Sequence, residues 1–300
     1  MSRGIVNFWR NRKRWGLLIL TGCFSLLLTQ VTSQVVARAQ QGDQNLGKME
    51  LQAGSAEKIV AFESAMNTTW EKEAESKGIF KVPKRFKSVT LSKAKLQKPE
   101  KVIALTFDDG PYPKYTDQVL DILKKNNIKA TFFLIGRNLA KHPEIAKRVA
   151  AEGHVVANHT WSHSYKNLSN QVSAKEINDT AALIKKVTGV KTTLFRPPGG
   201  ILTNGPADYA KKKGYTIVMW SADSIDYSRP GLDKLINNIM RDSSPGGITL
   251  FHDGGGDRSQ TVEALPKIIS KFKAQGYRFT TIPDLLQMQD QQQRELTAKK

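Results

Sequence analysis

The chain reads VIALTFDDG from Val102 to Gly110, which is the clearest structural signal in the sequence. The first four residues are all apolar, as is typical of a strand that is covered on both faces of a parallel sheet. Two carboxylates, Asp108 and Asp109, follow where this strand would end. Neighbouring like charges raise each other's pKa unless a cation lies close to both. The stretch therefore predicts a buried strand that ends at a metal site.

Short apolar runs alternate with amphipathic stretches from this point to about residue 281. The alternation predicts a parallel α/β fold, in which helices connect parallel strands. We expect strands at 102–107, 130–135, 154–157, 193–196, 216–220, 247–251 and 277–281. We expect helices near 115–126, 143–152, 173–188, 204–213, 231–242 and 259–275.

Polar residues follow several of these strands at the point where each strand ends. Taken singly, each has a structural explanation, such as a buried histidine or a helix cap. In a parallel barrel, however, the carboxyl ends of the strands meet on one side, where functional groups gather. We therefore expect one site that combines Asp108, Asp109, His159, Arg196, Asp223, Asp226 and His252.

Two histidines, His159 and His163, are four positions apart in the segment NHTWSHS. This spacing predicts that both imidazoles lie on one face of a helical turn, as zinc sites often require. One aspartate and two histidines give three protein ligands and leave a coordination position for water. Such a ligand set is typical of a catalytic metal site, because structural zinc sites are closed by four protein ligands.

The N-terminal region has the composition of a targeting segment. Five basic residues between Arg3 and Arg14 precede an uncharged stretch from Trp15 to Val36. We interpret residues 1–39 as a signal peptide or as a membrane anchor that spans residues 15–36. A third reading is lipidation at Cys23, the only cysteine, which also excludes an intramolecular disulfide. All three readings predict that the rest of the chain lies outside the cytoplasm, in the periplasm, in the cell wall or secreted.

Residues 40–99 are polar and basic, and we expect them to form a linker. The chain has a net charge of +19, and the stretch 77–98 contains eight basic residues and no acidic one. This stretch would suit an anionic wall polymer or lipid headgroups. We favour a solvated linker, because the stretch lacks the amphipathic period of an interfacial helix. We expect a folded domain at 100–287, a polar tail at 288–300 and no nucleic-acid partner.

Five motifs make the sequence similar to a known family. They are TFDDGP at 106–111, HxxxH at 159–163, FRPP at 195–198, DxxD at 223–226 and LFH at 250–252. In this order they resemble the motifs of the polysaccharide deacetylases, which form carbohydrate esterase family 4 and share the chitooligosaccharide-deacetylase homology domain. The resemblance implies a distorted parallel (β/α) barrel with about seven strands over residues 100–285. It also implies metal-dependent removal of N-acetyl groups from N-acetylhexosamine polymers.

The resemblance gives a role to each motif residue on the metal side of the site. Asp109, His159 and His163 would hold a divalent metal. Zn²⁺ is expected, with Co²⁺, Ni²⁺ or Mn²⁺ as alternatives. Asp108 would be the general base, and Arg196 would hold it in place.

The remaining roles fall on the opposite side of the scissile bond. His252 would be the general acid that protonates the leaving amine, with Asp226 supporting it. A histidine beside a carboxylate stays protonated nearer neutral pH, which suits this role. Leu250 would help to form a pocket for the acetyl methyl group.

Two positions differ from the family pattern. Many members carry an aromatic residue after the double proline, and its backbone N–H serves the oxyanion, whereas Gly199 and Gly200 stand here. Pro198 and Gly199 are still expected at the substrate site, but the missing ring predicts a more open cleft. The family's usual tryptophan after the second aspartate is replaced by Tyr227, which keeps an aromatic wall at the substrate site.

Three functions fit these motifs. The first is an extracytoplasmic N-deacetylase that acts on a polysaccharide such as peptidoglycan or a chitin-like polymer. The second is an O-acetyl esterase on an acetylated glycan such as xylan, which would use the same residues. The third is a non-catalytic wall-binding protein with a structural metal site. The presence of Asp108 and His252, neither of which is needed to bind the metal, argues against the third function.

Overall fold

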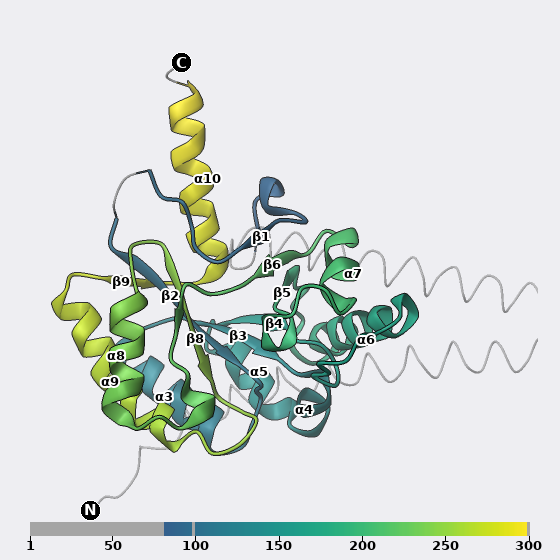
Figure 1. Cartoon of the computed structure of the whole chain (residues 1–300), viewed down its shortest axis with the longest axis horizontal. Coiled ribbons are helices and arrows are strands. Elements are labelled where there is room, and N and C mark those ends of the chain that lie inside the picture. Colours follow the sequence, from purple (N-terminus) through teal and green to yellow (C-terminus); the bar gives the residue numbers. More distant parts are fainter. Residues whose placement is uncertain (1–80, 98–99, 299–300) are drawn as a thin grey trace, which may run out of the picture. The chain divides into compact units, whose positions relative to one another are not determined.

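Nine parallel strands form one sheet in the computed structural model of the protein, which describes residues 81–97 and 100–298 (Figure 1). The predicted parallel α/β fold is therefore confirmed. Seven strands match the predicted ones, whereas β1 and β7 are two residues long and do not stand out as apolar runs. The strands are β1 (Thr90–Leu91), β2 (Val102–Asp108), β3 (Thr131–Leu134), β4 (Val155–Asn158), β5 (Leu194–Phe195), β6 (Thr216–Val218), β7 (Ala222–Asp223), β8 (Gly247–His252) and β9 (Arg278–Thr280).

Helices follow most of the strands, as the sequence predicts. They are α3 (Tyr115–Asn126), α4 (Gly136–Lys141), α5 (Pro143–Ala151), α6 (Asn170–Thr188), α7 (Pro206–Lys212), α8 (Leu232–Asp242), α9 (Ser259–Ala274) and α10 (Ile282–Ala298). The prediction missed α4 and α10. α4 is only six residues long, and the second half of α10 is too polar to show a helical period of apolar residues.

The strands close into a distorted barrel. β2 pairs with β8 on one side and with β3 on the other, and β4, β5 and β6 continue from β3. β6 and β7 are two halves of one interrupted stretch, of which the first half pairs with β5 and the second with β8. The chain from β2 to β8 thus runs once around the barrel, while β9 pairs with the first half of β2. This topology confirms the predicted distorted (β/α) barrel.

Residues 82–97 belong to the barrel domain, although the sequence analysis placed the linker boundary at residue 99. β1 pairs with β6, and the Ala94 amide donates a hydrogen bond of 2.9 Å to the carbonyl of Gly246, just before β8. Phe86 and Ala94 are buried in the core inside the barrel. The predicted boundary differs from the structure because exposed lysines such as Lys93 alternate with the few buried side chains and conceal them in the composition.

The predicted polar tail at 288–300 also differs from the structure, because it begins inside α10. Asp290 and Gln292 of this helix are buried. Asp290 forms ion pairs with Arg85 at 2.5 Å and with Arg294 at 2.8 Å. α10 is thereby tied to the segment that precedes β1.

The predicted targeting segment at 1–39, its Cys23 and the linker up to residue 80 lie outside the described residues. None of the helices within 81–97 and 100–298 has both the length and the apolar character needed to cross a bilayer.

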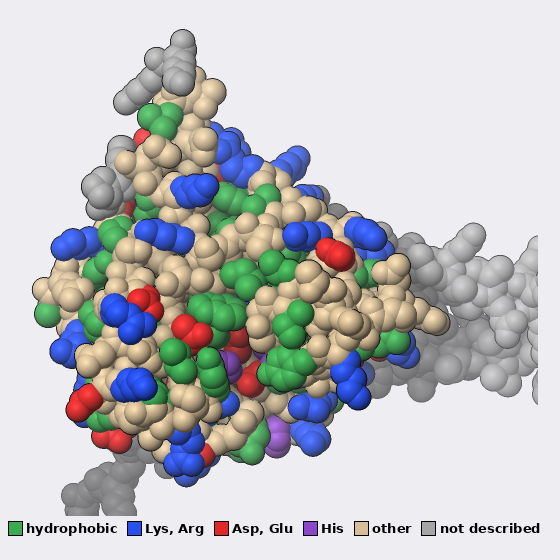
Figure 2. All heavy atoms as spheres, viewed as in Figure 1, with side chains coloured by type: hydrophobic (Ala, Val, Ile, Leu, Met, Phe, Trp, Pro, Cys, Tyr) green, Lys and Arg blue, Asp and Glu red, His purple; other side chains and the backbone are tan. Residues whose placement is uncertain are grey.

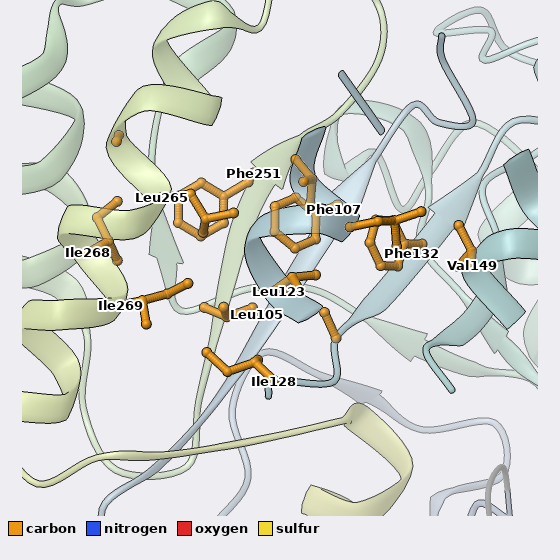
Figure 3. Packing of buried hydrophobic residues seen from close by; sticks show 14 of the residues in the cluster. Leu105, Phe107, Leu123, Ile128, Phe132, Val149, Phe251, Leu265, Ile268 and Ile269 are labelled. Atoms are coloured by element: carbon orange, nitrogen blue, oxygen red, sulfur yellow. The ribbon is translucent and has the colours of Figure 1, made fainter. Parts of the chain in front are cut away.

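Side chains of the strands alternate between an outer and an inner hydrophobic core. On β2, Leu105 and Phe107 belong to the outer core beneath the helices, and Ala104 belongs to the inner core of the barrel. Figure 3 shows the outer core, where the Phe107 ring stacks on Phe132 at 5.1 Å and on Phe251 at 5.6 Å between centroids. Burial of a side chain of this size stabilises the fold by roughly 1.5–3 kcal/mol. This layer therefore fixes β2, which carries the paired aspartates.

The inside of the barrel changes from apolar to polar along its length. Ile282 and Leu285 of α10 pack with Ala104 in the inner core. The same face of β2 continues with Thr106 and Asp108, both of which are buried. The carboxyl end of β2 therefore delivers a buried carboxylate to the mouth of the barrel.

Candidate active site

The carboxyl ends of the strands surround a cleft of about 690 Å³, which is within the usual range for small-ligand sites. Figure 2 shows acidic and histidine side chains near the centre of this face, with hydrophobic side chains around them. Three predicted site residues, Arg196, Asp226 and Pro198, are buried and do not line the cleft. The other nine do: Asp108, Asp109, His159, His163, Gly199, Asp223, Tyr227, Leu250 and His252.

Asp109, His159 and His163 form a possible metal site. One ligand atom from each residue lies within 4.8 Å of the other two. Asp109 Oδ1 is 3.1 Å from His163 Nε2 and 3.5 Å from His159 Nε2. This oxygen is buried and accepts no hydrogen bond. A cation would satisfy it, so the three side chains fit a divalent metal with one carboxylate and two imidazole ligands.

The charge of Asp109 supports this fit. Burial alone would raise the pKa of its carboxyl group. The charges of His159 and His163, both within ion-pair distance, outweigh burial, however, and hold the pKa of Asp109 well below its usual value. The carboxylate is therefore ionised and ready to bind a cation at neutral pH.

A backbone carbonyl group fixes the orientation of the His159 ring. Its Nδ1 lies 2.7 Å from the carbonyl oxygen of Arg196, to which it donates a hydrogen bond. This contact leaves the Nε2 lone pair directed at Asp109, which is the arrangement that metal-ligating histidines commonly adopt.

The two histidines do not lie on a helical turn, so this part of the prediction is wrong. They lie on the loop after β4, in which Thr160 and His163 have positive φ angles of 65° and 57°. The side chain of Asn158 accepts a hydrogen bond from the Thr160 amide at 2.9 Å, and the Thr160 hydroxyl accepts one from the His163 amide at 3.0 Å. A hydrogen-bonded loop, and not helical periodicity, brings residues 159 and 163 together.

Glu176 is a residue of this site that the sequence analysis did not identify. It lies on α6 and is buried. Its Oε2 accepts hydrogen bonds of 2.8 Å from the amides of Trp161 and Ser162, and its Oε1 accepts one of 2.7 Å from the Ser162 hydroxyl. The carboxylate thus holds the loop between the two histidine ligands. A glutamate among the buried positions Ser173, Ile177, Thr180 and Ile184 of one helix is the signal that could have revealed it.

Glu176→Ala should lower the affinity of the apoprotein for Zn²⁺ by about 10–100-fold, the usual effect of losing a group that orients metal ligands. The variant leaves the Trp161 and Ser162 amides without their acceptor, so the loop no longer holds His163. Competition with a chromophoric chelator measures the affinity, and thermal unfolding checks the fold. Glu176→Gln is the matched control, because the amide oxygen can still accept from both backbone amides and the NH₂ group can donate to the Ser162 hydroxyl. Equal Zn²⁺ affinity in the folded alanine variant would contradict this role.

Arg196 fixes the orientation of Asp108. It is completely buried, and its Nη1 donates hydrogen bonds of 2.8 Å to Asp108 Oδ1 and to the Thr106 hydroxyl. Its Nε donates to the carbonyl of Val218 at 2.9 Å, and its guanidinium lies over the Phe133 ring at 4.1 Å. Asp108 Oδ2 lies 3.7 Å from His159 Nε2 and stays available at the cleft.

His252, which lines the cleft, and the buried Asp226 form a second pair. His252 Nδ1 is 2.6 Å from Asp226 Oδ1, and Asp226 Oδ2 accepts the backbone N–H of His252 at 2.8 Å. The Thr261 hydroxyl, which the sequence analysis also missed, donates to the same oxygen at 2.7 Å. Burial opposes protonation of the ring, but the hydrogen bond and charge of Asp226 outweigh it and raise the pKa of His252 to about 9. His252 is therefore a cation at neutral pH, with Nε2–H left to donate a proton.

The strand register places the two proton-transfer groups beside each other. Asp108 and His252 are direct partners in the parallel pairing of β2 and β8, and neighbouring strands are about 4.8 Å apart. Leu250 lies two residues before His252, so its side chain points to the same face of β8. One pair of strands thus supplies a base, an acid and an apolar contact to the same cleft.

The predicted open wall beside Gly199 is occupied by an aromatic ring. A Cβ atom at Gly199 would lie 2.8 Å from Tyr165 Cε1, and one at Gly200 would lie 2.9 Å from Trp220 Cη2. Both rings line the cleft. The expected loss of the aromatic wall is therefore wrong, because two rings from other loops fill the space left by the glycines.

Comparisons with known proteins agree with the fold. A family model for polysaccharide deacetylase matches residues 95–218. A peptidoglycan-N-acetylglucosamine deacetylase of Bacillus cereus is 45% identical over 190 residues, which cover 62% of this chain and 89% of the relative. A chitooligosaccharide deacetylase of Bradyrhizobium is 36% identical over 198 residues, covering 61% of this chain and 90% of the relative.

A solved structure adds a further comparison. It is a pseudoenzyme of carbohydrate esterase family 4 from Bacillus anthracis, with a TM-score of 0.61 and 32% identity, covering 66% of this chain and 69% of that one. The order of the motifs, the barrel and these matches agree. The chain belongs to the polysaccharide deacetylase family, carbohydrate esterase family 4, whose active members are hydrolases.

Proposed function

We propose that this protein is an extracytoplasmic, metal-dependent deacetylase that removes N-acetyl groups from the amino sugars of peptidoglycan. Family membership establishes the reaction class, the deacetylation of a polysaccharide. One observation supports the metal-dependent mechanism. A cation site with three protein ligands lies beside a carboxylate and a protonated histidine that are not part of it.

The metal side of the cleft activates the carbonyl and the water. A divalent cation held by Asp109, His159 and His163 would supply Lewis acidity, which polarises an amide carbonyl and acidifies a water molecule. Asp108 then takes the proton from the attacking water through Oδ2, because Arg196 occupies Oδ1. The fixed orientation of Asp108 means that no rearrangement is needed at this step.

The opposite side of the cleft releases the amine. An amide nitrogen leaves only when it is protonated, and His252 Nε2–H is the donor that the structure provides. The C–N bond breaks as this proton is transferred, and the products are acetate and a free amino sugar. The backbone N–H of Gly199 remains the predicted donor to the oxyanion, and Leu250 the predicted contact of the acetyl methyl group.

The choice of peptidoglycan and the location rest on two observations. The 45% identical relative from Bacillus cereus is named as a peptidoglycan-N-acetylglucosamine deacetylase. Residues 1–39 have the composition of a signal peptide or membrane anchor, which would bring the domain to the cell wall. Recovery of the protein from the cytoplasmic fraction alone would contradict the location.

Acetate release by the full-length protein tests this function. The substrates are intact peptidoglycan, N-acetylglucosamine oligomers and acetylated xylan, each with and without a chelator. We expect acetate and new free amines in equal amounts from peptidoglycan, loss of activity with the chelator, and recovery when Zn²⁺ is added. Acetate without new amines would indicate an O-acetyl esterase instead.

A non-catalytic role is the second alternative, since one structural relative is a pseudoenzyme. The site argues against this role, because a structural metal site does not need the Asp108–Arg196 and His252–Asp226 pairs. Metal binding without acetate release from any of the three glycans would favour it.

The pH dependence of kcat should report on His252. The ring is in its acid form below a pKa of about 9, so kcat should fall as the pH rises above that value. Asp226→Asn removes the charge that raises this pKa, so the alkaline fall in kcat should move towards pH 6.5, the ordinary value of histidine. Profiles of kcat from pH 5 to 10 measure the alkaline fall in wild type and in Asp226→Asn. An alkaline limb at the same pH in wild type and Asp226→Asn would contradict the acid role.

A further inference from the structure

The two glycines after the double proline make room for aromatic rings. Gly199 and Gly200 have φ angles of 59° and 71°, in the left-handed region that favours glycine. A side chain at either position would also collide with a ring, Tyr165 at 199 and Trp220 at 200. The backbone at this corner of the cleft is therefore adapted to rings that come from other loops.

Tyr165 is the more accessible of these two rings. It is 59% exposed and lines the cleft. Its ring meets the metal ligand His163 at a centroid distance of 5.1 Å and an interplanar angle of 81°. Its contacts with His163 and Gly199 leave much of the side chain exposed, so Tyr165 has surface left for a ligand beside the reacting centre.

Exposed tyrosines concentrate at the cleft. The described part of the chain exposes seven large hydrophobic side chains, and the three tyrosines among them, Tyr112, Tyr165 and Tyr227, all line the cleft. An exposed aromatic ring offers an apolar face and a polar edge. A sugar ring has the same combination, with C–H groups on its faces and hydroxyl groups around its edge.

Tyr165 and Tyr227 lie on opposite sides of the proton-transfer groups. Tyr165 follows β4 and Tyr227 follows β7, and these strands are each two places from β2 in the sheet. Tyr165 contacts the metal ligand His163, whereas Tyr227 contacts His252 at 5.7 Å between ring centroids. A sugar chain that crosses the cleft between the two rings would pass over Asp108 and His252.

We propose that Tyr165 is a substrate-contacting, specificity-determining residue, which forms the wall of the cleft beside Gly199 and packs against the face of a sugar ring of the polysaccharide. This inference rests on the proposed function, because it names how the same site holds its substrate. Because residue 199 is a glycine and has no ring, Tyr165 makes the aromatic contact with the sugar in its place.

Kinetics with Tyr165→Leu and Tyr165→Phe test the proposal. We expect Tyr165→Leu to raise KM for N-acetylglucosamine hexamers by about tenfold, with little change in kcat, whereas Tyr165→Phe keeps the wild-type KM. Hydrolysis of 4-nitrophenyl acetate, which has no sugar, should be unchanged in both. Tyr209→Leu is the matched control, since Tyr209 lies on α7 and does not line the cleft. An unchanged KM for Tyr165→Leu, or an equal loss on the sugar-free ester, would overturn the proposal.

Hexamer binding separates this proposal from the proposed function. The dissociation constant is measured by calorimetry in the Asp108→Asn background, with Zn²⁺ present, so no turnover is needed. Tyr165→Leu should weaken binding by about tenfold even if wild type releases no acetate, a result that would overturn only the proposed function. Equal dissociation constants with and without the Tyr165 ring would overturn the present proposal alone.

Gly199→Ala provides an independent check of the contact. The new Cβ would lie 2.8 Å from the Tyr165 ring and displace it. Gly199→Ala should therefore weaken hexamer binding in a protein that has Tyr165 and add little in one that carries Tyr165→Leu, because the ring is then already absent. If the losses of hexamer binding caused by Gly199→Ala and Tyr165→Leu were fully additive, they would not both act through the Tyr165 ring. Thermal unfolding measures separately the strain that alanine introduces into the backbone.

Discussion

Asp108→Asn should reduce kcat on an N-acetylated glycan by about 10²–10⁴-fold, the usual contribution of a general base, while Zn²⁺ still binds. Asparagine can keep the oxygen that accepts the hydrogen bond from Arg196, so the buried arginine retains a partner. The second oxygen becomes an amide NH₂ group, which cannot accept a proton from water. The change therefore removes proton transfer and little else.

The neighbouring substitution Asp109→Asn is the control for Asp108→Asn. It makes the same chemical change one residue later, but on the side chain that faces His159 and His163. We expect this variant to lose Zn²⁺ affinity as well as activity, because a neutral amide is a poor ligand for a divalent cation. Metal content by elemental analysis and initial rates separate the two effects. A zinc-loaded Asp108→Asn protein with kcat within tenfold of wild type would show that Asp108 is not the base.

His252→Ala should have the second large effect, and the loss should depend on the leaving group. We expect kcat to fall by about 10²–10⁴-fold on an N-acetylated glycan, whose amine must be protonated before it departs. The loss on 4-nitrophenyl acetate should be much smaller, since 4-nitrophenolate leaves without a proton. The ratio of the two losses is thus the measurement that identifies a general acid.

His142→Ala is the matched control for His252→Ala. His142 lies between α4 and α5 and does not line the cleft, so its loss should leave both reactions unchanged. Equal losses of His252→Ala on the amide and on the ester would remove the general-acid assignment. Such a result would instead indicate that the pair of His252 with Asp226 holds the shape of the cleft.

Much of the fold could be predicted because its longer strands are strongly apolar. The helix predicted at 115–126 is α3 in full, and the run at 102–107 is nearly all of β2. The elements that were missed are those with weak local signals. β1 has two residues, and the polar half of α10 is fixed by ion pairs such as Arg85–Asp290. Those partners are far apart in the sequence, so no local pattern could show them.

The members of the site could be predicted from motif order, but the contacts that hold them in place could not. Asp108 ends β2 and Arg196 follows β5, two strands that do not pair, so only closure of the barrel brings the two side chains together. Glu176 acts through backbone amides of a loop, and Tyr165 through the absence of a side chain at Gly199. Neither relation leaves a fixed spacing in the sequence. His159 and His163 do lie beside Asp109 as predicted, but on a loop and not on a helical turn.

The central claim is that Asp109, His159 and His163 bind one divalent cation while Asp108 stays free to accept a proton. Anomalous X-ray scattering at the zinc edge, from crystals of the Zn²⁺-loaded protein, tests it most directly. We predict one strong peak at about 2.0–2.2 Å from a carboxylate oxygen of Asp109 and from Nε2 of both histidines, with Asp108 Oδ1 still bound to Arg196. A peak elsewhere, or one that Asp108 coordinates in place of Asp109, would contradict the claim.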